Sequence, residues 1–189
     1  GADSPGFNAV NRGKRSLVLD LKISEGREVF ERLARSTDIL IENYRPGVMA
    51  AFGLDYDAVA LLQPGLIYAS ISGYGQTGPA RAKGGFDLIA QGVAGIMSVT
   101  GEPGGRPVKA GVPVTDLGAG LFALVGILAA LESRHRDGRG QRVDTSLLEA
   151  GVALSVWEAT EHFSGAGLPS ALGSAHRMNA PYQAVRCAD

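Results

Sequence analysis

The chain has one cysteine in 189 residues, so it cannot form an internal disulfide. It has only three histidines, and none has a partner at a spacing typical of zinc sites or catalytic triads. The formal net charge of −1 gives the surface no general attraction for nucleic acid. These scarcities argue against disulfide scaffolds, zinc modules and nucleic-acid-binding proteins. We therefore expect no metal, no nucleic-acid partner and a cytoplasmic location.

Long apolar runs are also missing. The longest extends from Leu121 to Leu131, is interrupted by Gly126, and is shorter than the roughly 20 residues that span a bilayer. We expect no membrane partner. The chain has no Gly-x-Ser-x-Gly elbow, no Walker-type loop and no Gly-x-Gly-x-x-Gly after a strand. A serine hydrolase or a nucleotide-cofactor enzyme is therefore disfavoured.

The residues that are present indicate a globular α/β protein. At 45% hydrophobic and 20% charged, the chain can bury a core of ordinary size, and its 27 scattered glycines indicate tight turns. Apolar runs and amphipathic segments alternate, which predicts a parallel sheet with crossover helices. We expect strands at residues 17–21, 39–41, 66–71, 141–145 and 182–185. We expect helices at residues 24–34, 48–52, 57–62, 86–97, 117–135 and 146–163.

One carboxylate stands out among these elements. Asp116 comes just before the long apolar helix and is surrounded by small residues, including Gly118 and Gly120. It is either the N-cap of that helix or an exposed nucleophile. The Gly- and Pro-containing loop at residues 72–84 follows a buried strand, where open α/β sheets place ligands. The basic run at residues 11–15 is either a phosphate site or a solvated surface.

Several ordered motifs resemble the class III CoA-transferases, a family that includes formyl-CoA transferase and carnitine CoA-transferase. The resemblance covers essentially the whole chain. The matching segments are Asn11–Ser16, Leu19–Lys22, Glu42–Gly47, Gly73–Gly75, Gly85–Asp87, Asp116 and Gly138–Gln141. The resemblance implies a Rossmann-like large domain, a smaller second domain and interlocked homodimers.

The resemblance also implies roles for the two acidic residues. Asp116 matches the family's nucleophile, which attacks an acyl-CoA thioester to form an aspartyl anhydride and then an aspartyl-CoA thioester. Asp87 matches a second acidic site residue. Gly118 and Gly120 lie at the helix N-terminus, where N–H groups are expected to stabilise oxyanions.

The resemblance implies coenzyme A as a substrate and no prosthetic group. The expected partners of the protein are an acyl-CoA donor and a carboxylic acid acceptor. By resemblance, CoA contacts are expected at Leu19, Leu21, Lys22, Asn43, Tyr44, Val48, Phe52, Lys83 and Phe86. Two positions depart from relatives. Ala51 stands where some relatives have an arginine, so Arg45, Arg81 or Lys83 is expected to supply charge. Phe86 stands where the family's racemases carry a histidine, which favours transfer over racemisation.

The resemblance divides the chain into three parts. Residues 1–147 belong to the large CoA-binding domain, 148–172 form a helix and linker, and 173–189 begin the small domain. We expect an internal fragment that lacks the family's first strand and turn. A racemase or isomerase of the same family remains an alternative, as does a non-catalytic CoA-binding or scaffold protein.

Overall fold

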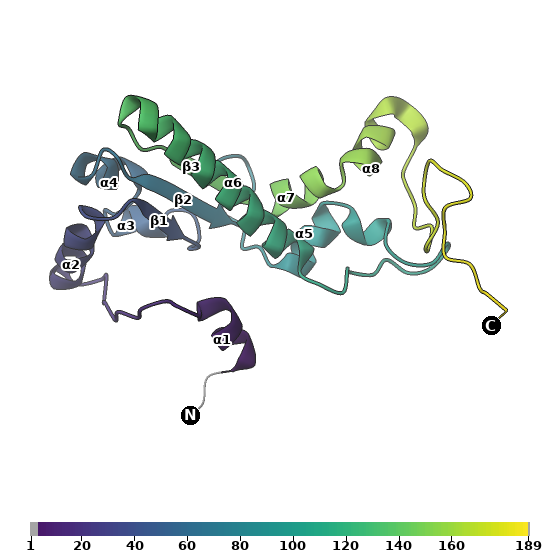
Figure 1. The fold of residues 1–189 in the computed structure, drawn as a ribbon, viewed down its shortest axis with the longest axis horizontal. Coiled ribbons are helices and arrows are strands. Elements are labelled where there is room, and N and C mark those ends of the chain that lie inside the picture. The colour runs from purple at the N-terminus through teal and green to yellow at the C-terminus, as the bar shows by residue number, and fades with distance from the viewer. Residues whose placement is uncertain (1–3, 189) are drawn as a thin grey trace.

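A computed structural model describes residues 4–188 and has a three-stranded parallel sheet at its centre (Figure 1). The strands are β1 (Ile39–Glu42), β2 (Ile67–Ser72) and β3 (Arg142–Ser146), arranged in the order β1-β2-β3. In register, Ile39 lies beside Ile67, and Tyr68 lies beside Arg142. The prediction of a parallel α/β fold is confirmed.

The side chains of the central strand β2 alternate between the two faces of the sheet, so β2 packs against helices on both. On one face Tyr68 is buried with residues of α2 (Ser24–Ala34), α3 (Val48–Ala51) and α4 (Tyr56–Leu62). Its hydroxyl donates a 3.0 Å hydrogen bond to the Leu54 carbonyl. On the other face Ile67 and Ala69 pack against α6. Helices therefore cover both sides of the sheet.

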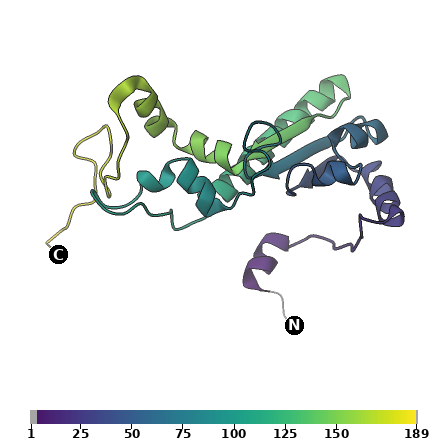
Figure 2. The ribbon, with the colours of Figure 1, turned by 180° about the vertical axis from the view of Figure 1, so that it is seen from behind.

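Helix α6 (Val114–Asp137) crosses the length of the sheet (Figures 1 and 2). Gly126 allows the helix to approach the sheet closely, because a Cβ at this position would lie 2.7 Å from a Val143 methyl group. At its far end, Arg134 donates to the Gly65 carbonyl at 2.9 Å and pairs with Asp38 at 3.1 Å. These contacts fix α6 as a core helix on the sheet.

The apolar character of α6 extends further than the sequence indicated. At 24 residues it is the one helix in residues 4–188 that is long and apolar enough to cross a membrane by length and composition. The predicted helix, Leu117 to His135, was five residues shorter than α6. One face of α6 packs on β2 and β3, but only 33% of its apolar window is buried, and Leu121, Val125 and Leu128 are each more than half exposed.

Two predicted helices are each divided in the structure. Residues 86–97 form α5 (Asp87–Val93) and the 3₁₀ turn η1 (Ile96–Ser98), separated at Gly95, whose φ is +82°. Residues 146–163 form α7 (Leu147–Leu154) and α8 (Val156–Glu161), followed by η2 (His162–Ala166). Ser155 separates α7 from α8, and its hydroxyl donates to the Gly151 carbonyl at 3.0 Å, a bond that competes with regular helix geometry.

Two predicted strands do not form. Residues 17–21 are extended but pair with no strand among the described residues, and Val18 is 93% exposed. Residues 182–185 also lack strand structure. Conversely, α1 (Pro5–Asn11) was not predicted, although Ser4 caps it and Pro5 suits its first turn.

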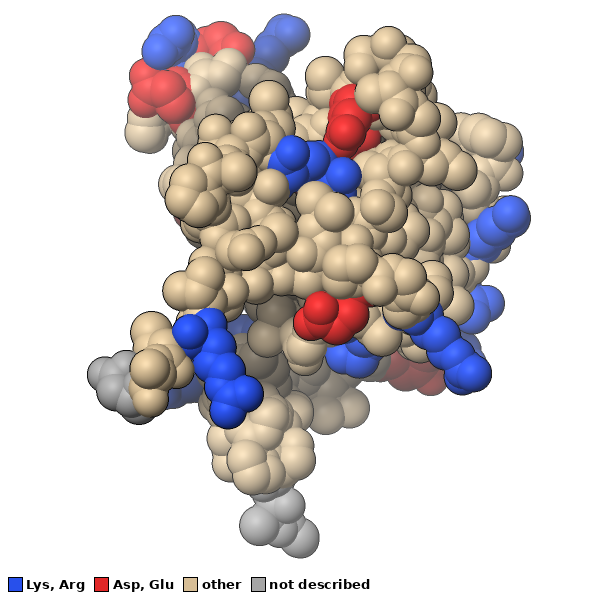
Figure 3. Space-filling model, turned by 90° about the vertical axis from the view of Figure 1, so that its right-hand side faces the viewer, with Lys and Arg blue, Asp and Glu red and all other residues tan. Residues whose placement is uncertain are grey.

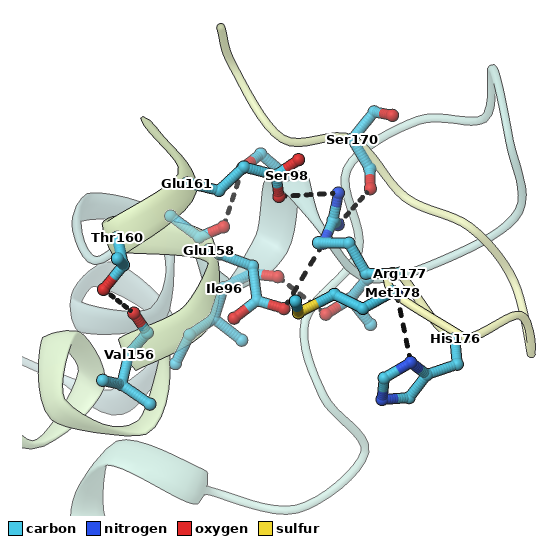
Figure 4. A network of polar contacts seen from close by, with 12 residues as sticks. Ile96, Ser98, Val156, Glu158, Thr160, Glu161, Ser170, His176, Arg177 and Met178 are labelled. Carbon is cyan, nitrogen blue, oxygen red and sulfur yellow. Dashed lines mark hydrogen bonds and ion pairs between the residues drawn. The ribbon is translucent and has the colours of Figure 1, made fainter. Parts of the chain in front are cut away.

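The segment after η2 folds back onto α8 (Figure 4). Arg177 lies 3.7 Å from Glu158 and 3.4 Å from Glu161, and it donates to the Ser170 carbonyl at 2.8 Å. Figure 3 shows this end of the molecule, where blue and red groups lie against one another amid largely uncharged surface. The start of the predicted small domain is therefore tied to α8 by a charged contact. The division of the chain into domains stays a prediction.

Candidate active site

The candidate site lies where β2 and β3 end and α5, α6 and α7 begin (Figure 1). Two glycines bring these elements together. A Cβ on Gly85 would lie 2.5 Å from the Gly73 Cα, so neither position has room for a side chain. The Gly73 carbonyl also accepts a 3.1 Å bond from the Leu148 N–H at the start of α7. The contact holds the loop after β2 against the segment that leads into α5.

Asp116 is the third residue of α6 and is exposed. The helix begins three residues earlier than predicted, at Val114, with Pro113 at the N-cap position and no side-chain cap bond there. The interpretation of Asp116 as N-cap is therefore wrong. In the described part of the chain, no hydrogen bond to its carboxylate is found. Its oxygens are open to a ligand.

Asp87, the first residue of α5, caps α6 from a neighbouring helix. Its Oδ1 accepts from the Thr115 N–H at 3.0 Å and from the Thr115 hydroxyl at 2.7 Å. The Thr115 N–H, one of those that begin α6, is thus satisfied by a carboxylate, which also suits the positive end of the helix dipole.

The two carboxyl groups have pKa values shifted in opposite directions. Burial raises the pKa of Asp87, but hydrogen bonds from Thr115, Gln91 and Asp116 outweigh it, so the pKa lies below its ordinary value. Burial, and then the charge of Asp87, raise the pKa of Asp116. Asp87 therefore stabilises the folded state above the ordinary carboxyl pKa, and this stabilisation is lost as the pH falls through its lowered value.

The expected oxyanion donors are not free. Val114 donates to the Val112 carbonyl at 2.9 Å, and the Thr115 N–H is bound to Asp87. Gly118 and Gly120 lie inside α6, where the helical ladder uses their N–H groups. Gly118 serves packing, since a Cβ there would lie 3.3 Å from Ala150. The prediction that Gly118 and Gly120 supply oxyanion donors is therefore wrong.

Four of the residues expected to contact CoA surround one cavity of about 230 Å³. Asn43 and Tyr44 reach it from the loop after β1, and Lys83 and Phe86 reach it from the segment before α5. Asn43 is held there by a 2.6 Å bond from its Nδ2 to the Ile71 carbonyl. Phe86, which lines the cavity, directly precedes Asp87, although neither Asp87 nor Asp116 lines it.

The other expected CoA contacts lie elsewhere. Leu21 and Phe52 pack against the buried cluster beneath α2 and α4, so they are core residues here. Leu19 and Lys22 lie in the extended segment before α2, and Val48 is the first residue of α3. The structure does not bring these five residues to the cavity.

Arg45 is best placed to supply the charge that Ala51 cannot. It lines the cavity, and its Nη2 lies 3.3 Å from where a Cβ of Gly84 would be. Lys83 lines the same cavity. Arg81 instead donates to the Gly78 carbonyl within its own loop, at 3.4 Å. The cationic groups beside Phe86 are thus Arg45 and Lys83.

Two site residues escaped the sequence analysis. Thr115 and Gln91 are both fully buried, and both bond to Asp87. Gln91 follows Asp87 by four residues, a helical spacing at which Asp and Gln side chains meet. That spacing was the feature of the sequence from which the Asp87–Gln91 contact could have been predicted. Among residues 4–188, no group of three or more potential metal ligands is found.

Comparison with known proteins identifies the family of the chain. The family described as CoA-transferase family III matches residues 1–189. Succinate–glutarate CoA-transferase of Agrobacterium fabrum is 44% identical over 97% of this chain and 46% of its own length. Acetyl-CoA:oxalate CoA-transferase of Acetobacter aceti is 40% identical over 97% of this chain and 47% of its own length.

A solved structure is also similar. The crystal structure of a CAIB/BAIF family protein from Brucella suis superposes with a TM-score of 0.87 and 41% identity. The superposition covers 94% of this chain and 47% of that one. The chain therefore spans less than half the length of the relatives it matches.

Proposed function

Because the chain belongs to CoA-transferase family III, we propose that the protein containing it transfers coenzyme A from an acyl-CoA to a carboxylic acid. The observation that carries the proposal is the exposed carboxylate of Asp116, which accepts no hydrogen bond among the described residues and lies close to Asp87, whose chain neighbour Phe86 lines the cavity. Burial and the charge of Asp87 raise the pKa of Asp116, which strengthens the ionised carboxylate as a nucleophile.

We propose that Asp116 acts as a covalent carrier. One of its oxygens attacks the thioester carbonyl and the C–S bond breaks. CoA departs as the thiolate, and an acyl-aspartyl anhydride is formed. The thiolate then attacks the aspartyl carbonyl and releases the first acid. The acceptor carboxylate attacks the resulting thioester, and the thiolate leaves again. Finally the thiolate attacks the acceptor's carbonyl, which forms the new acyl-CoA and frees Asp116 with no net proton transfer.

The acceptor class follows from the relatives' names. Succinate, glutarate and oxalate are all short dicarboxylic acids. We propose a short dicarboxylic acid for this protein too. Arg45 and Lys83 are the cations in the cavity that suit an anionic substrate, whether the phosphates of CoA or a free carboxylate. The interlocked dimer and the small domain beginning at residue 173 belong to the same proposal.

A trapping experiment tests this function. Full-length protein is incubated with succinyl-CoA without an acceptor, trapped with hydroxylamine or borohydride, and digested for mass spectrometry. We expect the modification at Asp116. Modification at Asp87 or Asp144 would contradict the assignment. Exchange of the α-proton without an adduct would indicate the racemase alternative, and CoA binding with neither outcome would indicate a scaffold.

A variant of the second carboxylate tests the electrostatics. In Asp87→Asn the neighbouring negative charge is gone, so the pKa of Asp116 falls and the acidic limb of the kcat/KM profile moves to lower pH. The rate at neutral pH falls about 10- to 100-fold because the start of α6 loses its ionic cap. A pH–rate profile from pH 4 to 8 measures both effects. An acidic limb at an unchanged pH would show that Asp87 does not influence Asp116.

A further inference from the structure

Gln91 lies in the middle of a chain of hydrogen bonds that ends at Thr115, the residue before Asp116. Its Nε2 donates to Asp87 Oδ2 at 2.6 Å, and its Oε1 accepts from the Ala110 N–H at 2.8 Å. The other oxygen of Asp87 holds Thr115, directly before Asp116. Both the carboxamide and the carboxylate are therefore bonded on two sides.

This chain of bonds joins three separate segments. Gln91 and Asp87 lie on α5, Ala110 lies on the loop that leads to α6, and Thr115 lies in the first turn of α6. Gln91 is 0% exposed. A fully buried carboxamide has no water to replace its partners, so losing one leaves the other unsatisfied. Gln91 is thus held by protein partners alone, and it donates one of the hydrogen bonds that Asp87 accepts.

The apolar packing around the three segments leaves little freedom. Ala90, beside Gln91, is buried against Ala119 and Ala150. A Cβ on Gly151 would lie 2.6 Å from Ala94 and 3.2 Å from Thr115. Because α5, α6 and α7 are this closely packed, α5 can transmit the position of its side chains to the start of α6.

We propose that Gln91 is a positioning residue for CoA transfer: it orients Asp87, and through Thr115 it fixes the direction in which the Asp116 carboxylate points. Gln91 contacts no substrate in this role. It acts by keeping the nucleophile in an attacking geometry while the loop before α6 stays in place. The inference rests on the proposed function, since it assigns Asp116 as the nucleophile.

The test compares full-length Gln91→Met and Gln91→Glu with wild type. Methionine keeps the volume but removes both hydrogen bonds. Glutamate keeps the acceptor for Ala110 but, when ionised, cannot donate to Asp87. We expect both variants to lose at least about tenfold in kcat and to form the Asp116 adduct correspondingly slowly, with KM within about twofold of wild type. If one variant does not fold, the other still tests the proposal.

Tyr68→Phe provides the matched control. It also removes one buried hydrogen bond, but on the opposite face of the sheet, beneath α4. We expect it to lower the melting temperature while kcat stays at the wild-type value. A Gln91 variant that keeps its kcat, or a Tyr68→Phe variant that loses as much, would overturn the proposal.

Amide hydrogen exchange separates this proposal from the proposed function. In Gln91→Met we expect faster exchange at Ala110 and Thr115, with unchanged exchange at Ala69 in the core of the sheet. If wild type transfers no CoA, the proposed function fails, whatever the exchange shows. If wild type is active and exchange at Ala110 and Thr115 does not change in Gln91→Met, the positioning role fails alone.

Discussion

Replacing Asp116 with asparagine in the full-length protein is expected to lower kcat for CoA transfer by on the order of a thousandfold or more. An amide has the same shape as the carboxylate but cannot attack a thioester and form an anhydride. Transfer from succinyl-CoA to a dicarboxylic acid, followed by chromatography of the acyl-CoA products, measures the loss. CoA binding should persist because Asp116 does not line the cavity beside Phe86.

The same variant tests whether Asp116 has a structural role. Loss of an N-cap costs about 1 kcal/mol of stability. Here the structure predicts no loss, because Asp116 accepts no hydrogen bond in residues 4–188 and Asp87 repels its charge. We therefore expect an unchanged or slightly raised melting temperature at neutral pH. A wild-type kcat in Asp116→Asn would rule out Asp116 as the nucleophile. A clear drop in melting temperature would show that Asp116 caps α6.

Asp144→Asn is the control for a carboxylate near the sheet end. Burial raises the pKa of Asp144, and its Oδ2 accepts a 3.0 Å bond from the Gln76 N–H in the loop after β2. Its role is thus to hold this loop. We expect Asp144→Asn to lower kcat far less than Asp116→Asn does.

Replacing Gly85 with alanine is expected to destabilise the fold by about 2–3 kcal/mol, the upper range for overpacking. The added Cβ would lie 2.5 Å from the Gly73 Cα, and backbone cannot move aside as a flexible side chain can. The loop after β2 and the start of α5 must therefore separate. We expect transfer activity to fall with stability, because Phe86 and Asp87 follow Gly85 directly. Urea denaturation of the full-length protein measures the stability.

Gly120→Ala is the matched control. Gly120 is also a glycine close to the site, but nothing lies within 4 Å of where its Cβ would be. It lies inside α6, where alanine is favoured over glycine by about 1 kcal/mol. We expect Gly120→Ala to raise stability. Equal stability of Gly85→Ala and wild type would show that the Gly73–Gly85 contact is not required.

The predicted strands show what local sequence can and cannot decide. The runs around Ile39 and Ile67 form strands as predicted because each has the other to pair with. The run at residues 17–21 has the same apolar character but pairs with no strand among the described residues, so it forms no strand. A strand depends on a partner, and a partner distant in sequence cannot be inferred from the residues of the strand itself.

The helix ends show the same distinction. The start of α7 follows a local signal: Ser146 precedes Glu149 by three residues, the spacing of a capping box, and the Glu149 N–H donates to the Ser146 hydroxyl at 3.1 Å. The cap of α6 is instead a side chain 28 residues away, Asp87. Because Asp116 looked like a suitable local cap, the sequence suggested the wrong residue.

The sequence by itself determined the α/β class, the positions of the core strands, and Asp116 as the carboxylate to examine, because periodicity and motif order are local or linear properties. Only the tertiary structure decided that Asp87 caps α6, that Gln91 bonds to Asp87, and that the Asp116 carboxylate accepts no hydrogen bond among the described residues. Those assignments depend on which side chains meet after α5 packs beside α6. Burial and distance decide them, and neither is a property of any single segment.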